Sequence, residues 1–136
     1  MNRDRIAALL PHGGDMVLLD RADAVTSTTI TCSTSSHLRA EHPLRKGGAL
    51  ACVHAIEYAA QAAAVHGALQ GSESPMTGYL GSVRGVELLS DRLDIPGQLV
   101  IEIEMLMRDP RGAIYRFVVR NETERLASGR FTIVFT

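Results

Sequence analysis

The feature that most constrains this chain is a long run of small apolar residues at positions 49–69 (ALACVHAIEYAAQAAAVHGAL). Ala, Gln, Glu and Leu favour helix, and apolar residues surround this helix on all sides, which is typical of a buried helix. The run is as long as a membrane-spanning helix. It also carries four polar side chains that would be costly in lipid: His54, Glu57, Gln61 and His66. We therefore expect a buried helix and no membrane insertion.

Segments with strand patterns surround this helix. In residues 98–108 (QLVIEIEMLMR) apolar and charged residues alternate, so one sheet face is expected to be buried and the other wet. We also expect a helical turn at 6–10, a tight turn at 12–15, and strands at 16–25, 28–35, 79–89, 114–121 and 126–136. This order predicts one domain, 1–136, with an α+β fold in which an antiparallel sheet wraps around one long central helix.

Composition excludes several classes of protein. The net charge is −1 and the basic residues form no stripe, which argues against nucleic-acid binding. Cys32 and Cys52 lack zinc-ligand spacing and are expected to be core residues. No export signal is visible at the start, so a reducing cytoplasm is the expected compartment. We expect no metal.

Glu57 is a first candidate for chemistry. It lies among small apolar residues of the predicted helix, where an ionised carboxylate is costly unless it is paired. His54 lies three residues earlier and Gln61 four residues later, so the three polar groups are expected on one helical face. A hydrogen-bonded stripe that only positions the helix is an equally good interpretation.

His42 is a second candidate, in the long loop of residues 37–48. Pro43 stiffens its backbone, and Gly47-Gly48 is expected to lead the chain into the helix with free amides. Such amides can hold an oxyanion or a thioester carbonyl. A loop base, a helix carboxyl and free amides together predict a proton-abstraction site.

These residues resemble a known family. Residues 10–12 (LPH) with 18–21 (LLDR), and residues 56–62 (IEYAAQA), are similar to motifs of the 3-hydroxyacyl-carrier-protein dehydratases, which have the hotdog fold. The chain looks closest to the small dehydratase-like proteins of aryl-polyene clusters. The resemblance implies dehydration of a 3-hydroxyacyl thioester to a trans-2-enoyl thioester, on an acyl carrier protein whose phosphopantetheine carries the substrate, with no other cofactor.

The resemblance also implies residue roles. His42 matches the histidine that removes the C2 proton, and Glu57 matches the carboxyl group that protonates the departing C3 hydroxyl. Family members pair two subunits so that the histidine of one faces the carboxylate of the other. The amide that polarises the thioester falls near Cys52, and Gln61 and His54 are supporting residues. Three basic residues are candidate contacts for the carrier protein or phosphopantetheine, or else ordinary solvated charges: Arg39, Arg45 and Lys46.

The loop departs from the family pattern, because it reads HPLRKGG after the glutamate at position 41 and has Ala51-Cys52 where the family has Pro-Gly. Two alternatives therefore stay open beside the dehydratase. One is an acyl thioesterase, and the other is a non-catalytic or half-site partner subunit of a hotdog heterodimer. The pairing could be a homodimer or a heterodimer.

Overall fold

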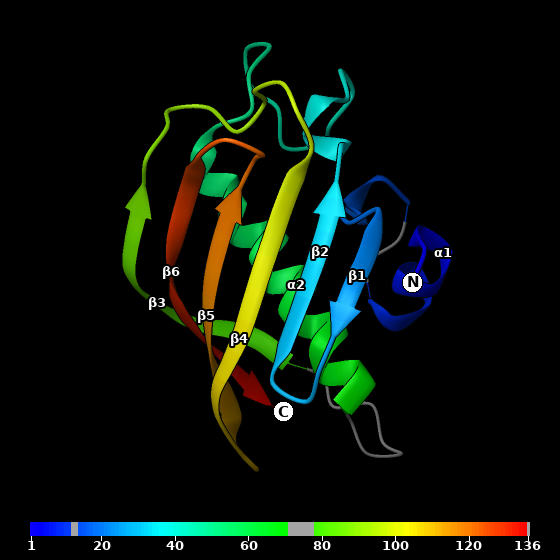
Figure 1. The fold of residues 1–136 in the computed structure, drawn as a ribbon, viewed down its shortest axis with the longest axis vertical. Coiled ribbons are helices and arrows are strands. Elements are labelled where there is room, and N and C mark those ends of the chain that lie inside the picture. The colour runs from blue at the N-terminus through cyan, green and yellow to red at the C-terminus, as the bar shows by residue number, and fades with distance from the viewer. Residues whose placement is uncertain (12–13, 71–77, 136) are drawn as a thin grey trace.

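The computed structural model describes residues 1–11, 14–70 and 78–135, with Asp15 described by its backbone alone. His12 and Gly13 of the expected tight turn lie outside these residues. The elements, shown in Figure 1, are α1 Arg3–Leu9, 3-10 turn Gly14–Met16, β1 Arg21–Val25, β2 Thr29–Thr34, 3-10 turns Ser36–Leu38 and Cys52–His54, α2 Ala55–Gln70, β3 Gly78–Leu88, β4 Leu99–Asp109, β5 Gly112–Arg120 and β6 Arg125–Phe135.

The six strands form one antiparallel sheet in the order β1-β2-β4-β5-β6-β3. The helix α2 crosses one face of this sheet, called here the inner face, and packs against β2, β4 and β5 (Figure 1). Along β4, Leu99, Ile101 and Ile103 are buried on the inner face, while Glu102 and Glu104 lie on the outer face. The predicted sheet around a central helix is confirmed.

The helix starts later than predicted. Gly47 and Gly48 have φ angles of 58° and 78°, and Lys46 and Ala49 exchange backbone hydrogen bonds of 2.9 and 3.0 Å. This geometry is a two-residue hairpin turn with two left-handed positions, which glycine adopts without strain. The glycine pair therefore reverses the chain, and the first helical turn begins only at Cys52. The prediction that the pair leads directly into the helix is wrong.

Burial of α2 is also one-sided. Tyr58, Ala59 and Ala62 are fully buried against the sheet. Glu57 and Ala64 are exposed along the opposite side of the helix. No described helix is long and apolar enough to cross a bilayer.

The strand β3 occupies an edge of the sheet. Within the described residues it pairs with β6 alone. All of its residues except Val86 are exposed. Leu80, Val83 and Leu88 are thus apolar residues of β3 that the described chain covers only in part.

Candidate functional site

His42 lies on the loop between β2 and α2 and is only 3% exposed. Its Nε2 atom lies 3.0 Å from the hydroxyl of Tyr58 on α2. That hydroxyl lies 2.7 Å from Ser36 Oγ, and Ser36 donates to the Leu18 carbonyl at 2.6 Å. A continuous chain of hydrogen bonds therefore connects the loop histidine to the helix and to the segment before β1.

The partners of the His42 ring determine where its proton lies. The Leu44 amide donates to Nδ1 at 3.1 Å, so Nδ1 carries no proton. The proton of the neutral ring is then on Nε2, which donates to the Tyr58 oxygen. Burial lowers the pKa of His42, and the neighbouring guanidinium groups lower it further. His42 is thus held neutral, and neither ring nitrogen has a free lone pair.

Glu57 has a different environment from the one predicted. Its side chain is 49% exposed, so the expected burial is wrong for the single chain. Its Oε2 atom lies 2.8 Å from Nδ1 of His54, which is itself 26% exposed. Among the described residues, no hydrogen bond joins Glu57 to His42. One chain therefore presents the two candidate groups separately, one in the interior and one at the surface.

Gln61 does not extend the polar stripe of Glu57 and His54, because it points inward and is 5% exposed. Its Oε1 atom accepts from the Leu18 amide at 2.9 Å, and its Nε2 atom donates to the Met16 carbonyl at 2.5 Å. These bonds hold the chain at Met16 and Leu18 against α2, and β1 begins only at Arg21, later than predicted. Gln61 thus supports the Leu18 end of the chain of hydrogen bonds that begins at His42.

Arg45 has an internal role instead of the predicted surface role. Its side chain is 14% exposed and pairs with Asp94, itself 4% exposed, at 2.7 Å. Three backbone carbonyls also accept from it: those of Arg39 at 2.6 Å, His37 at 2.9 Å and Gly48 at 3.3 Å. The prediction of Arg45 as a carrier-protein contact is therefore wrong, since its guanidinium is used to hold the loop together.

Asp94 is the anchor of this loop. The hydrogen bond from Arg92 above all, with that from Arg45, holds the pKa of Asp94 well below its usual value. Lys46 is exposed and stays a candidate contact. Arg39 is half-buried, and its Nη2 atom is buried without a hydrogen-bond partner among the described residues. Its predicted role also stays a prediction.

Cys52 does not offer a free amide. Its N–H donates to the Asp91 carbonyl at 3.1 Å, so this amide is engaged within the chain. An oxyanion amide near Cys52 stays a prediction. The Cys52 thiol donates to the Leu126 carbonyl at 3.3 Å, and burial raises its pKa. Cys32 is a free, buried cysteine like Cys52, as predicted, and its pKa is raised to about 12 by burial. Within the described ranges, no three His, Cys, Asp or Glu side chains gather as metal ligands would.

Sequence reasoning missed Tyr58 and Ser36, the two residues that connect His42 to the core. Tyr58 did carry a signal, since it is the one Phe, Tyr or Trp in the run 49–69. A buried tyrosine hydroxyl needs a partner, and a histidine in the preceding loop was available. Ser36 gave no comparable signal, because it lies among several serines and threonines.

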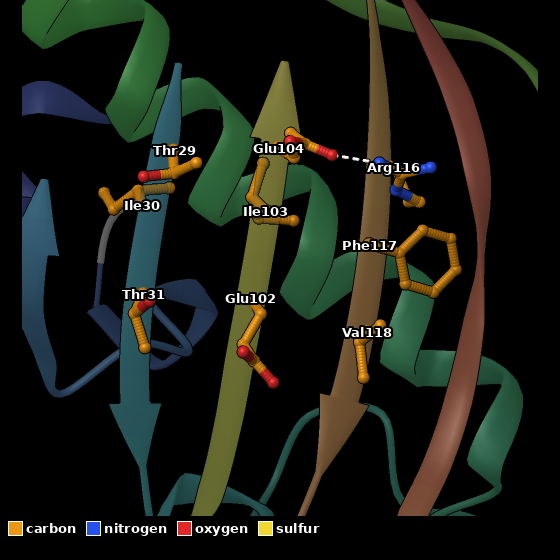
Figure 2. Close-up of a pocket in the computed structure, with 9 residues that line it drawn as sticks. All are labelled: Thr29, Ile30, Thr31, Glu102, Ile103, Glu104, Arg116, Phe117 and Val118. Carbon is orange, nitrogen blue, oxygen red and sulfur yellow. Dashed lines mark hydrogen bonds and ion pairs between the residues drawn. The ribbon is translucent and has the colours of Figure 1, made fainter. Parts of the chain in front are cut away.

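A hollow of about 320 Å³ lies on the outer face of the sheet, away from His42. Figure 2 shows its side chains on β2, β4 and β5, including Thr31, Glu102 and Arg116. Glu104 pairs with Arg116, and Glu102 pairs with Arg120 at 2.7 Å. These carboxylates are already neutralised by neighbours, so this hollow does not have the unpaired groups of a reaction site.

Comparisons with known proteins agree with this fold. The family model of the ApeP dehydratases, called ApeP-like, matches residues 4–135. The dehydratase heterocomplex ApeI:P from Xenorhabdus doucetiae is similar with a TM-score of 0.83 and 24% identity, covering 100% of this chain and 91% of that chain. A comparison with curated proteins gave no match.

Thioesterases share the architecture at lower identity. A thioesterase from Haemophilus influenzae has a TM-score of 0.72 at 13% identity, covering 100% of this chain and 91% of that chain. A hypothetical thioesterase with coenzyme A from Streptococcus pneumoniae has a TM-score of 0.61 at 14% identity, covering 85% and 84%. These likenesses concern the fold, whereas the family match spans nearly the whole sequence. The chain therefore belongs to the ApeP-like family and is a hotdog-fold dehydratase.

Proposed function

We propose that this chain takes part in dehydrating 3-hydroxyacyl thioesters on an acyl carrier protein, in aryl-polyene or fatty-acid-like synthesis, at a site shared by two hotdog subunits. One observation carries the proposal: His42 is interior while Glu57 is exposed and free to meet another chain. A carboxyl group and a histidine must both reach the substrate for this reaction. Two subunits that exchange these groups would complete the site.

The chemistry needs one base and one acid. The base removes the C2 proton, which the polarised thioester carbonyl makes acidic, and the acid protonates the C3 hydroxyl as it leaves as water. Glu57 is the acid of this proposal, because its exposed side chain at the start of α2 is free to reach a substrate held by a second subunit. His42 suits the base only after its ring leaves the Leu44 amide, because Nδ1 holds the lone pair of the neutral ring and Nε2 carries the proton.

The occupied His42 ring favours a second candidate, a half-site role. In that case Glu57 of this chain works with the histidine of a related hotdog subunit, and His42 is structural. The likeness to the ApeI:P heterocomplex supports a heterodimer of this kind. A thioesterase stays a lesser alternative, supported only by the shared architecture.

Mass-spectrometric assay of 3-hydroxyacyl and 2-enoyl carrier-protein thioesters tests these roles. The chain is assayed alone and with a related hotdog subunit, as wild type, His42→Ala and Glu57→Gln. Loss of dehydration by about 10²-fold or more in Glu57→Gln supports the shared site. Loss in a His42→Ala variant that circular dichroism shows to be folded assigns His42 the base, whereas retained activity assigns it the half-site role. Full activity in both variants contradicts the proposal, and release of free acid as the main product identifies a thioesterase.

A further inference from the structure

The edge strand β3 has a free side and an uncovered apolar inner face. Val83 pairs with the buried Phe131 of β6 and so points to the same inner face, yet it is 36% exposed. Leu80 and Leu88 are exposed by 41% and 44%. The helix α2 packs mainly on β2, β4 and β5, and these three side chains stay partly exposed. An edge strand with exposed apolar residues is suited to pair with another chain.

The outer face of the same strand carries a row of like charges. Arg84 on β3 lies opposite Arg130 on β6, and Arg130 lies opposite Arg116 on β5. We call these three residues the arginine row. Beyond them Arg116 lies opposite Glu104 and forms an ion pair with it. Among the described residues neither Arg84 nor Arg130 has an ion-pair partner.

The two arginines without an ion-pair partner in the described chain lie together on the outer face of β3 and β6. Arg84 and Arg130 line one hollow of about 270 Å³ together with the hydroxyls of Ser82 and Thr132. Like charges directly opposite on neighbouring strands destabilise a sheet. Glu87 lies opposite Ser128, so it is on the same outer face of β3 as Arg84. Three guanidinium groups and the carboxylates of Glu104 and Glu87 therefore leave one net positive charge. Arg84 lies on the strand whose other edge pairs with no described strand.

We propose that the arginine row selects the subunit that pairs along β3. The occupant is a related hotdog chain with carboxylates on the outer face of its own edge strand, and it is preferred over a second copy of this chain. The proposal rests on the proposed pairing of two hotdog subunits. It goes beyond that pairing by naming the positive charge on β3 as the feature that selects the partner.

The preference follows from how two edge strands meet. Arg84 lies near the middle of β3, so antiparallel pairing centred on the strand would place two copies of Arg84 as diagonal neighbours, about 7–8 Å apart. That separation is within the Debye length of about 8–10 Å at physiological salt. Two copies of the row would thus repel, whereas a partner carboxylate would attract Arg84. Specificity of this kind combines attraction to the right partner with repulsion of the wrong one.

The test uses this chain as its own acidic partner. Wild type is mixed with Arg84→Glu, and native mass spectrometry measures self-paired and mixed dimers. We expect mixed dimers to exceed the statistical proportion by about fivefold to tenfold at low salt, and this excess to shrink as sodium chloride is raised from about 50 to about 500 mM. Wild type alone should pair more tightly as the salt is raised.

Arg111→Glu is the matched control, because Arg111 undergoes the same charge change on the exposed turn between β4 and β5. It should mix with wild type in the statistical proportion.

Arg84→Gln is a second variant, for use if the glutamate variant folds poorly. It should tighten self-pairing of the chain severalfold. A statistical mixture with Arg84→Glu, no pairing at all, or wild-type self-pairing unaffected by both salt and Arg84→Gln would overturn the proposal. The proposal is also contradicted if the mixture of wild type with Arg111→Glu shows the same salt-dependent excess of mixed dimers. It is contradicted as well if inorganic phosphate alone abolishes the salt dependence of pairing. These readouts measure mass and not turnover, so a failed dehydration assay leaves them unaffected.

Discussion

The two sides of α2 differ in how completely their polar and apolar groups are satisfied. On the loop side, the His42 ring nitrogens and the Tyr58 hydroxyl all have partners within the chain. On the opposite side, Glu57 is 49% exposed and pairs with His54, and Val83 of β3 is 36% exposed among the described residues. The first side is completed by folding of one chain, and the second is left for another chain to complete.

This contrast separates stability from assembly. Substitutions on the loop side should lower the free energy of unfolding, because they leave buried groups without partners. Substitutions on the side of Glu57 and β3 should leave the chain folded and change only pairing or turnover. Four changes test this difference, from the largest expected effect to the smallest.

Arg45→Ala should cause the largest loss of stability. It removes the ion pair to the buried Asp94 and the hydrogen bonds that hold the loop around His42. Because Arg92 still pairs with Asp94, we expect the free energy of unfolding to fall by about 2–4 kcal/mol. Urea unfolding followed by circular dichroism measures it. Arg111→Ala, with a side chain 92% exposed, is the control and should change little. Equal losses in the two variants would contradict the internal role of Arg45.

Tyr58→Phe should lower the free energy of unfolding by about 1–3 kcal/mol. The change keeps the ring but leaves the His42 Nε2–H without its acceptor and removes the hydrogen bond that Ser36 Oγ accepts from Tyr58. Burial raises the pKa of Tyr58 to about 12, so the hydroxyl is present throughout the neutral range. Tyr79→Phe on β3 is the matched control, since Tyr79 is 55% exposed. A larger loss in the control would break the contrast between the two sides.

Acid should destabilise the chain through its buried histidines. Burial lowers the pKa of His37, His42 and His66 from 6.5. The unfolded chain therefore binds more protons below about pH 6.5, so stability is complete above that pH and falls as the pH falls. Each histidine contributes a slope of at most about 1.4 kcal/mol per pH unit. His66→Gln should reduce this slope in urea titrations between about pH 5 and pH 7, and an unchanged slope would exclude His66 as a contributor.

Val83→Asp should have the smallest effect on the chain itself. Because Val83 lies on the exposed inner face of β3, the free energy of unfolding should change by no more than about 0.5 kcal/mol. Pairing measured by sedimentation should weaken about tenfold, since a carboxylate would be buried against the partner. Unfolding of the isolated variant would show instead that β3 is completed within the chain.

The strands could be predicted because their alternation reflects contacts with the chain's own helix. Residues 98–108 predict β4 to within one residue, and residues 79–89 predict β3 equally well. The start of the helix could not be predicted in the same way. Whether Gly47-Gly48 opens a helix or closes a hairpin depends on Lys46 and Ala49 exchanging hydrogen bonds, which composition does not reveal.

The candidate site was predictable in its residues but not in their surroundings. Glu57 has small apolar neighbours along the helix, yet the sheet covers the other side of α2, so the sequence suggested burial where the chain has exposure. Arg45 shows the converse, because its partner Asp94 is 49 residues away. Sequence spacing gives no sign of a contact that only the folded loop creates.

The exposed β3 edge also affects how the chain must be handled. A strand with free backbone groups and bare apolar side chains is a template for uncontrolled aggregation, and a charge such as Arg84 in mid-strand is a common safeguard against it. An unaccompanied copy of this chain is therefore expected to depend on the charges of Arg84 and Glu87 to keep this edge soluble. Yields of soluble protein should rise when a suitable companion subunit is produced alongside it.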